Sequence, residues 1–286
     1  MDQILVIGGN GHVGGQVLSQ LQDKGVRVRA LVRNPDTARM PACVEMVRGD
    51  LAAPESLDAC LEGVDAVFLV WTAPPATAAA AVERIAKHAR RIVYLSAPIK
   101  TQHPLFQSSL PNSSSRLNVE LERLIEASGL QWTFLRPGMF AANAREWWAP
   151  QTRQGDVVKW PYLSAPTAPI DERDIAAVAV QALCEDGHSG GDYVLTGPES
   201  LTQYEQVATV GRAIGRSLRI EEMSPEEARR EWLATWPPPV VNMLLTAWRA
   251  AIGQPAYVTS TVAEVTGRPA RTFLNWATDH AAAFQG

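Results

Sequence analysis

Residues 3–33 read QILVIGGNGHVGGQVLSQLQDKGVRVRALVR. An apolar strand enters a turn dense in glycine, a helix begins near His12, and a second apolar strand ends at Arg33. This order makes one βαβ unit. Glycine suits the turn because the backbone bends sharply and lets a pyrophosphate approach with no Cβ in the way. The helix directs its free N–H groups and positive dipole end at the phosphates, so the stretch predicts dinucleotide binding.

The spacing of the glycines fits two types of loop. Gly8, Gly11 and Gly14 match G-x-x-G-x-x-G, whereas Gly9, Gly11 and Gly14 match G-x-G-x-x-G. A glycine motif by itself also fits a tight turn without a ligand. Here a strand precedes the motif and a helix follows it, and that context favours the dinucleotide loop.

The end of the second strand bears on which dinucleotide binds. An NAD site usually has Asp or Glu about 20 residues past the glycines, where it holds the ribose 2′-hydroxyl. This chain has Arg33 there, followed by Asn34. A guanidinium cannot accept a hydrogen bond from a hydroxyl, but it matches a 2′-phosphate well. NADP(H) is therefore expected in preference to NAD(H), with a solvated arginine at the strand end as the alternative.

Composition and charge are typical of a soluble cytoplasmic enzyme. The 286 residues suffice for one large α/β domain and a smaller lobe. The net charge of −4 and the sequence pI of about 5.8 show no basic footprint for nucleic acid. The three cysteines are scattered and odd in number, which predicts free thiols in a reducing compartment.

No metal site and no membrane segment is expected. The five histidines are not paired at metal-ligand spacing. Residues 1–9 lack the cationic start of a signal peptide, and the longest apolar stretches are strand-sized. The expected partner is a small apolar or aromatic molecule, without nucleic acid or membrane, and the expected assembly is a monomer or a homodimer.

Strands and helices alternate through the first half of the chain. Strands are expected at 44–51, 65–71, 91–97 and 130–140, and helices at 54–64, 76–90 and 115–129. This alternation predicts an α/β fold with a Rossmann-type, doubly wound parallel sheet. Ligands of such sheets bind at the carboxyl ends of the strands.

Those strand ends provide the predicted cofactor contacts. The set is Gly8, Gly9, Asn10, Gly11, His12, Val13, Arg33, Asn34, Asp50, Leu51, Val70, Trp71, Thr72, Ser96, Ala97, Pro137 and Gly138. Asp50 has two interpretations, because it either touches the adenine or caps the helix that follows its strand.

The pattern changes beyond residue 140. Residues 144–170 contain three Trp, four Pro and one Gly and are expected to loop over the cleft. Asp171 is a plausible N-cap for a helix at 170–185, and Thr202 and Ser224 are helix starts of the capping-box type. Short strands are expected at DYVLTGP (192–198) and LRIEEM (218–223).

These elements predict two domains. Residues 1–143 form an NAD(P)-binding Rossmann domain, and residues 144–286 form a smaller, mixed and mainly helical substrate-binding lobe. The helix at 170–185 is expected to pack back on the Rossmann sheet.

Six parts of the chain carry a resemblance to a known family. They are GGNGHVG (8–14), Arg33, GDL (49–51), SGLQWTFLRPGMF (128–140), PIDERDIA (169–176) and TGRPARTFLNWA (266–277). Over nearly its whole length the chain resembles the NmrA-like group of atypical short-chain dehydrogenases/reductases. That group contains reductases of dyes, quinones and imines alongside redox-sensing regulators. The resemblance therefore implies the fold and an NAD(P) cofactor, and it leaves the reaction open.

One departure from the parent superfamily concerns catalysis. Short-chain dehydrogenases usually carry Tyr-x-x-x-Lys on the helix after the fifth strand, and a Ser or Thr just past that strand. The lysine lowers the pKa of the tyrosine so that the phenol can protonate a carbonyl oxygen. With the register anchored at Glu122 and Gly129, the Tyr and Lys positions hold Ser114 and Asn118, and the Ser/Thr position falls near Pro98. An ordinary alcohol dehydrogenase is not expected.

Two functions fit a site without those groups. In the first, the protein is an NADPH-dependent reductase of a small, flat, electron-poor substrate, such as an imine or iminium ion, a quinone, a dye or an enone. Such a substrate takes hydride with little acid help when it is held close to the nicotinamide and water is excluded. In the second, the protein is an NADP(H)-binding redox sensor of the NmrA type. A non-redox enzyme on the same fold is a third alternative.

Tryptophans after the sixth strand are candidates for the substrate pocket. Trp147, Trp148 and Trp160 are expected to form a wall for a flat, apolar substrate, with core packing as the alternative. Three more either complete this wall or pack the small lobe, namely Trp232, Trp236 and Trp248.

Five other residues complete the candidate site. Asn118 and Ser114 are the catalytic candidates, as hydrogen-bond donors or as groups that orient the nicotinamide, and plain helix-surface residues are the alternative. Met139, Phe140 and Tyr162 are substrate-pocket candidates by position, and Tyr162 is also a conceivable replacement acid.

Overall fold

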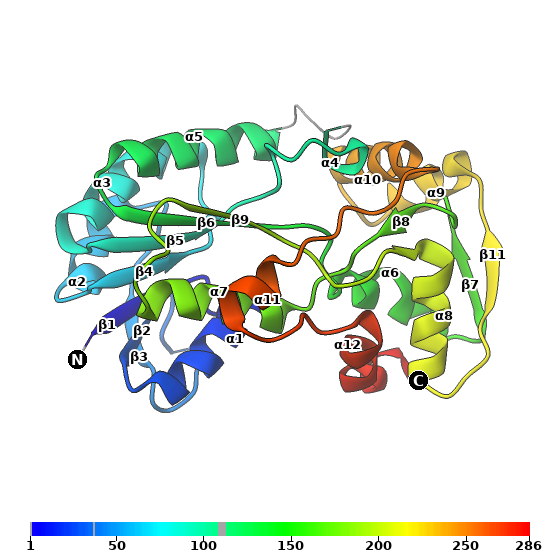
Figure 1. Ribbon diagram of the computed structural model, residues 1–286, viewed down its shortest axis with the longest axis horizontal. Coiled ribbons are helices and arrows are strands. Elements are labelled where there is room, and N and C mark those ends of the chain that lie inside the picture. The colour runs from blue at the N-terminus through cyan, green and yellow to red at the C-terminus, as the bar shows by residue number, and fades with distance from the viewer. Residues whose placement is uncertain (1, 37, 108–112) are drawn as a thin grey trace.

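A parallel sheet forms the centre of the molecule. The computed structural model describes residues 2–36, 38–107 and 113–286, with the backbone alone at 113 and 114. Seven strands pair in the order β3-β2-β1-β4-β5-β6-β9, and all of these pairs are parallel (Figure 1). The strands are β1 (Gln3–Ile7), β2 (Arg27–Val32), β3 (Glu45–Arg48), β4 (Ala66–Leu69), β5 (Arg91–Leu95), β6 (Gln131–Pro137) and β9 (Gly191–Leu195). The predicted Rossmann-type sheet is confirmed.

Helices cover both faces of this sheet. One face carries α1 (His12–Leu21), α7 (Glu172–Cys184) and α11 (Thr261–Thr266), and the other carries α2 (Asp58–Leu61), α3 (Ala78–His88) and α5 (Ser113–Ala127). In β1, Ile4 and Val6 join the first core, whereas Leu5 and Ile7 join the second. Successive side chains of a strand point to opposite faces, so a strand buried on both faces is apolar throughout.

The helix predicted at 54–64 is shorter than expected. A 3₁₀ turn at Pro54–Leu57 leads into the single turn of α2, and Gly63 follows with a positive φ of 70°. A left-handed residue cannot continue a right-handed helix, so the segment ends there.

The chain leaves the sheet after β6 and later returns to it. Helix α7 packs against α1, and β9 pairs with β6 as the outermost strand. The predicted N-cap of α7 is confirmed, because the Asp171 carboxylate accepts a hydrogen bond from the Arg173 amide at 2.9 Å.

The remaining elements form a C-terminal lobe beyond the carboxyl ends of the strands (Figure 1). Its helices are α4 (Pro104–Gln107), α6 (Asn143–Thr152), α8 (Gln203–Ala213), α9 (Pro225–Trp232), α10 (Pro238–Ala251) and α12 (Phe273–Asp279). Its small sheets pair β8 (Pro166–Thr167) with β10 (Leu201–Thr202) and β7 (Val157–Trp160) with β11 (Arg219–Glu222). The capping boxes at Thr202 and Ser224 are confirmed, and each begins a lobe helix.

Residues 144–170 do not form the predicted loop. They contribute most of α6 and the strands β7 and β8 to the lobe. Trp147 and Trp148 lie on α6 and are buried, so the packing of two large side chains stabilises a helix whose local sequence pattern is weak. Among the described residues, no helix combines the length and apolar character needed to cross a membrane.

Candidate cofactor and substrate site

The turn after β1 has the backbone geometry of a phosphate-binding loop. Gly8 has a φ of +97°, and a Cβ added there would lie 2.7 Å from the Cβ of Val70. A Cβ on Gly14 would lie 2.1 Å from the carbonyl oxygen of Gly8. The Gly11 amide donates to that same carbonyl oxygen at 3.0 Å. A Cβ on Gly9 would instead meet the flexible end of Leu18, so G8-x-x-G11-x-x-G14 is the spacing that the backbone requires.

Helix α1 begins directly at this loop. Its N-cap, Gly11, has no side-chain cap, and no acidic residue lies in the first turn. The first amides of a helix lack partners within the helix and favour an anion. Loop and helix therefore fit the pyrophosphate of a dinucleotide, because the glycines let the turn pack closely against Val70 and the start of α1, where the free amides point at an anion.

A hollow next to the loop contains two exposed arginines. It measures about 610 Å³ and is lined by Asn10, Val32, Arg33, Asn34, Ala38 and Arg39. Within the described part of the chain, neither Arg33 nor Arg39 forms an ion pair with a carboxylate. The sequence analysis missed Arg39 because it lies in the irregular segment between β2 and β3, where no periodic pattern marks its position. Two guanidinium groups in one hollow suit a 2′-phosphate.

Three of the predicted cofactor contacts make protein contacts of their own. Asp50 accepts a hydrogen bond from the Ala52 amide at 2.9 Å and so closes the turn after its strand, whereas the N-cap of the following 3₁₀ helix is Ala53, without a side-chain cap. Leu51 is buried in the core under α2 and α3. The Trp71 indole donates to the carbonyl oxygen of Ala73 at 2.7 Å.

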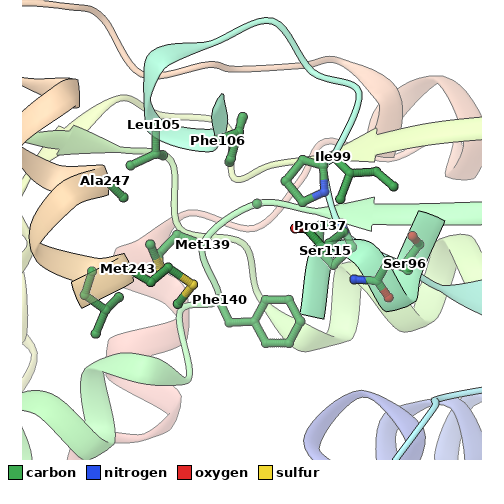
Figure 2. Close-up of a pocket in the computed structure, with 15 residues that line it drawn as sticks. Ser96, Ile99, Leu105, Phe106, Ser115, Pro137, Met139, Phe140, Met243 and Ala247 are labelled. Carbon is green, nitrogen blue, oxygen red and sulfur yellow. The ribbon is translucent and has the colours of Figure 1, made fainter. Parts of the chain in front are cut away.

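The second part of the site is an apolar pocket of about 320 Å³ at the ends of β5 and β6 (Figure 2). The predicted residues Ser96, Ala97, Pro137, Gly138, Met139, Phe140 and Asn118 all line it. Pro98 also lines it, as the position of its strand end predicts. Seven further lining residues were not predicted from the sequence, namely Ile99, Leu105, Phe106, Ser115, Met243, Leu244 and Ala247. Met243, Leu244 and Ala247 have helical spacing on α10, but spacing alone does not distinguish a pocket from a core.

The predicted aromatic wall is absent from this pocket. Trp147, Trp148 and Trp160 are 7%, 0% and 1% exposed and pack in the core of the C-terminal lobe. Trp160 lies 5.5, 5.7 and 5.4 Å, between ring centroids, from Trp147, Trp148 and Trp248. Tyr162 packs against the same core and does not line the pocket. The prediction of a substrate-facing wall was wrong, because a large aromatic ring gains most from complete burial.

Asn118 reaches the pocket from α5 and is held there by Tyr94. Its Oδ1 accepts a hydrogen bond from the Tyr94 hydroxyl at 2.6 Å. Burial, together with the nearby charge of Glu122, raises the pKa of Tyr94, so the phenol stays protonated and acts as the donor. The Asn118 amide nitrogen is then the group left to donate to a ligand. Ser114, the other catalytic candidate, has a side chain outside the described part.

A buried ionic network fixes the strand ends behind the pocket. The Ser96 hydroxyl donates to Glu122 at 2.5 Å, and the Arg136 guanidinium donates to the other oxygen of Glu122 at 2.8 Å. Arg136 also pairs with Asp192 of β9. The network ties α5 to β5, β6 and β9, and so it positions the pocket wall. None of the fifteen lining residues carries an ionisable side chain.

Comparisons with known proteins agree with this geometry. A family model described as NAD(P)H-binding matches residues 8–186. A (4-alkanoyl-5-oxo-2,5-dihydrofuran-3-yl)methyl phosphate reductase of Streptomyces griseus is 41% identical over 98% of this chain and 99% of its own. An NAD(P)H azoreductase of Xenophilus azovorans is 35% identical with the same coverage.

Solved structures show the same fold at lower identity. An NADPH-dependent quinone oxidoreductase from Escherichia coli has a TM-score of 0.79 at 21% identity, over 96% of this chain and 98% of its own. A triphenylmethane reductase from Citrobacter sp. has a TM-score of 0.78 at 20% identity, over 98% and 99%.

Proposed function

The chain belongs to the NAD(P)H-binding family and is an oxidoreductase of the NmrA-like type, and on this basis we propose that it is an NADPH-dependent reductase of electron-poor unsaturated carbonyl compounds that carry an alkyl chain. The observation that carries this proposal is the mainly apolar pocket, lined by residues without ionisable groups, at the ends of β5 and β6.

The cofactor is held by the first half of the site. Gly8, Gly11 and Gly14 allow the tight turn that brings the pyrophosphate to the free amides at the start of α1. Arg33 and Arg39 bind the 2′-phosphate and favour NADPH over NADH. Bound NADPH supplies a hydride.

The apolar pocket holds the hydride acceptor and excludes water. Ser96, Pro137 and Gly138 line this pocket at the carboxyl ends of β5 and β6. Ligands of such sheets bind at that edge, which supports a position next to the nicotinamide. Asn118 donates a hydrogen bond from its amide nitrogen to the carbonyl oxygen of the acceptor. The proton that completes the reduction comes from solvent after the hydride has been transferred, when the product is no longer shielded from water, since none of the residues lining the pocket is an acid.

The lining combines aliphatic side chains with the rings of Phe106 and Phe140, which suits an alkyl chain attached to a flat, unsaturated group. Met139, Met243, Leu244 and Ile99 are unbranched or aliphatic side chains that adapt to a flexible chain. The Streptomyces relative is named for a methyl phosphate ester on an unsaturated lactone that also carries an alkanoyl group. It shares the alkyl chain and the unsaturated carbonyl group with this class, while the phosphate is a further group for which the apolar lining holds no cation.

The cytoplasm is the proposed location, supported by the three free cysteines. The division into domains 1–143 and 144–286 stays a proposal, with α7 and β9 returning to the sheet.

The test is NADPH oxidation with unsaturated ketones and lactones whose alkyl chain grows stepwise, run beside quinones, cyclic imines and azo dyes. We expect kcat/KM to rise with chain length and NADH to serve poorly. Equal rates on acceptors without an alkyl chain would contradict the substrate class. Tight NADPH binding with no turnover on any acceptor would contradict the reductase and favour a redox sensor.

A further inference from the structure

The C-terminal lobe reaches the phosphate end of the cleft through Arg145 of α6. Its Nη2 donates a hydrogen bond to Nδ1 of His12 at 3.1 Å. His12 is the first residue of α1 and follows Gly11, the N-cap at the glycine loop. A guanidinium therefore lies beside the helix start where the pyrophosphate of a dinucleotide binds.

Arg145 is held in place from three helices. Its guanidinium lies 3.6 Å from Oε1 of Glu172, a buried carboxylate in the first turn of α7. The guanidinium carbon also lies 5.9 Å from the ring centroid of Trp276 on α12. The Trp276 indole in turn donates to Oε2 of Glu172 at 3.0 Å. These contacts fix the direction of the side chain, which stays 28% exposed.

The guanidinium still has donors to offer to a ligand. A guanidinium only donates, so Nδ1 of His12 is the acceptor and the His12 ring carries its proton on Nε2. Of the five N–H donors of Arg145, one has a hydrogen-bond acceptor among the residues that the structure describes, because Glu172 lies beyond hydrogen-bond distance.

We propose that Arg145 binds the pyrophosphate of NADPH, so that the C-terminal lobe contributes a ligand to the cofactor site. The proposal rests on the function proposed above, in which the glycine loop holds NADPH. A bidentate guanidinium matches two phosphate oxygens, and the uncapped amides of α1 approach the same anion from the sheet side.

The experiment measures, by calorimetry and with no substrate present, the dissociation constants of three probes. NADPH and 2′-phospho-ADP-ribose contain the pyrophosphate, whereas 2′-AMP contains only the adenosine 2′-phosphate end. Arg145→Ala should weaken the binding of NADPH and 2′-phospho-ADP-ribose by about ten- to a hundredfold and leave the dissociation constant of 2′-AMP unchanged. Arg33→Ala should weaken all three. Arg230→Ala removes an exposed charge from α9 of the same lobe and should change none.

Other outcomes decide against the proposal. Unchanged constants for all probes, or an equal loss for 2′-AMP, would overturn the role of Arg145. If Arg145→Ala fails to fold, Arg145→Lys takes its place. Arg145→Lys keeps the positive charge but lacks the planar guanidinium, so it should still weaken the binding of NADPH and 2′-phospho-ADP-ribose and not that of 2′-AMP. A wild-type protein that binds none of the three would instead overturn the proposed function.

Discussion

The two halves of the candidate site differ in whether backbone or side chains form them. The phosphate half consists mainly of backbone, with glycines at Gly8 and Gly14 and the free end of α1. The apolar half consists of side chains from five separate stretches, the ends of β5 and β6 and the helices α4, α5 and α10. A backbone site leaves a compact motif in the sequence, whereas a side-chain site depends on how distant segments pack. The phosphate half should therefore tolerate fewer substitutions, whereas substitutions in the apolar half can change substrate specificity.

The largest expected effect tests whether the lobe tryptophans belong to the core and not to the pocket. Trp148→Ala removes an indole that is 0% exposed and should lower the free energy of unfolding by about 3–5 kcal/mol. Met243→Ala changes a pocket residue that is 36% exposed, so it should cost far less stability and raise KM for an alkyl-bearing substrate. Denaturant unfolding and steady-state kinetics measure both.

Trp148→Phe keeps most of the apolar volume and should destabilise in the same direction by a smaller amount. A Trp148 variant with wild-type stability and a raised KM would show that the indole faces the substrate after all.

The next effect tests how strictly the backbone half depends on glycine. In Gly14→Ala the new methyl group would lie 2.1 Å from the Gly8 carbonyl oxygen, so the loop must shift. We expect a loss of about 3 kcal/mol in stability and of most NADPH affinity. Gly15→Ala is the matched control, because its Cβ would lie 3.5 Å from the Gly9 carbonyl oxygen, an ordinary contact. It should keep NADPH affinity and gain about 0.5–1 kcal/mol in stability. Similar behaviour of the two variants would contradict the close packing.

A third test separates the two cofactors. Arg33→Ala removes a charge-assisted hydrogen bond to the 2′-phosphate and should weaken NADPH binding by about 1.5–3 kcal/mol, while NADH binding stays unchanged. Arg39→Ala should act in the same direction by a smaller amount, because Arg39 lies in an irregular segment next to the hollow. The measurement is a pair of dissociation constants for each variant. Equal losses for NADPH and NADH would remove the preference for NADPH from the proposal.

The sequence predicted those features well that depend on a short, continuous stretch of residues. The βαβ unit, the order of strands and helices, and the caps at Asp171, Thr202 and Ser224 are local signals, and each is confirmed. The pocket was only half found, because Met139 and Phe140 follow a strand end but Met243 lies over a hundred residues away on α10. The tryptophans misled for a related reason. The sequence shows that many tryptophans are present, but it does not show whether their rings line a ligand site or pack against one another in a core.

The smallest effect tests the polar group of the apolar half. Asn118→Ala removes one neutral hydrogen bond to the acceptor and should lower kcat by about tenfold or less, with the NADPH dissociation constant unchanged. Tyr94→Phe keeps the buried ring but removes the hydroxyl that fixes Oδ1 of Asn118 at 2.6 Å. The freed amide can rotate, so kcat should fall by less than in Asn118→Ala. Because the two side chains act as a pair, the double variant should resemble Asn118→Ala and not show the product of both losses. Independent losses would mean that Tyr94 supports the fold of the strand and that Asn118 acts without it.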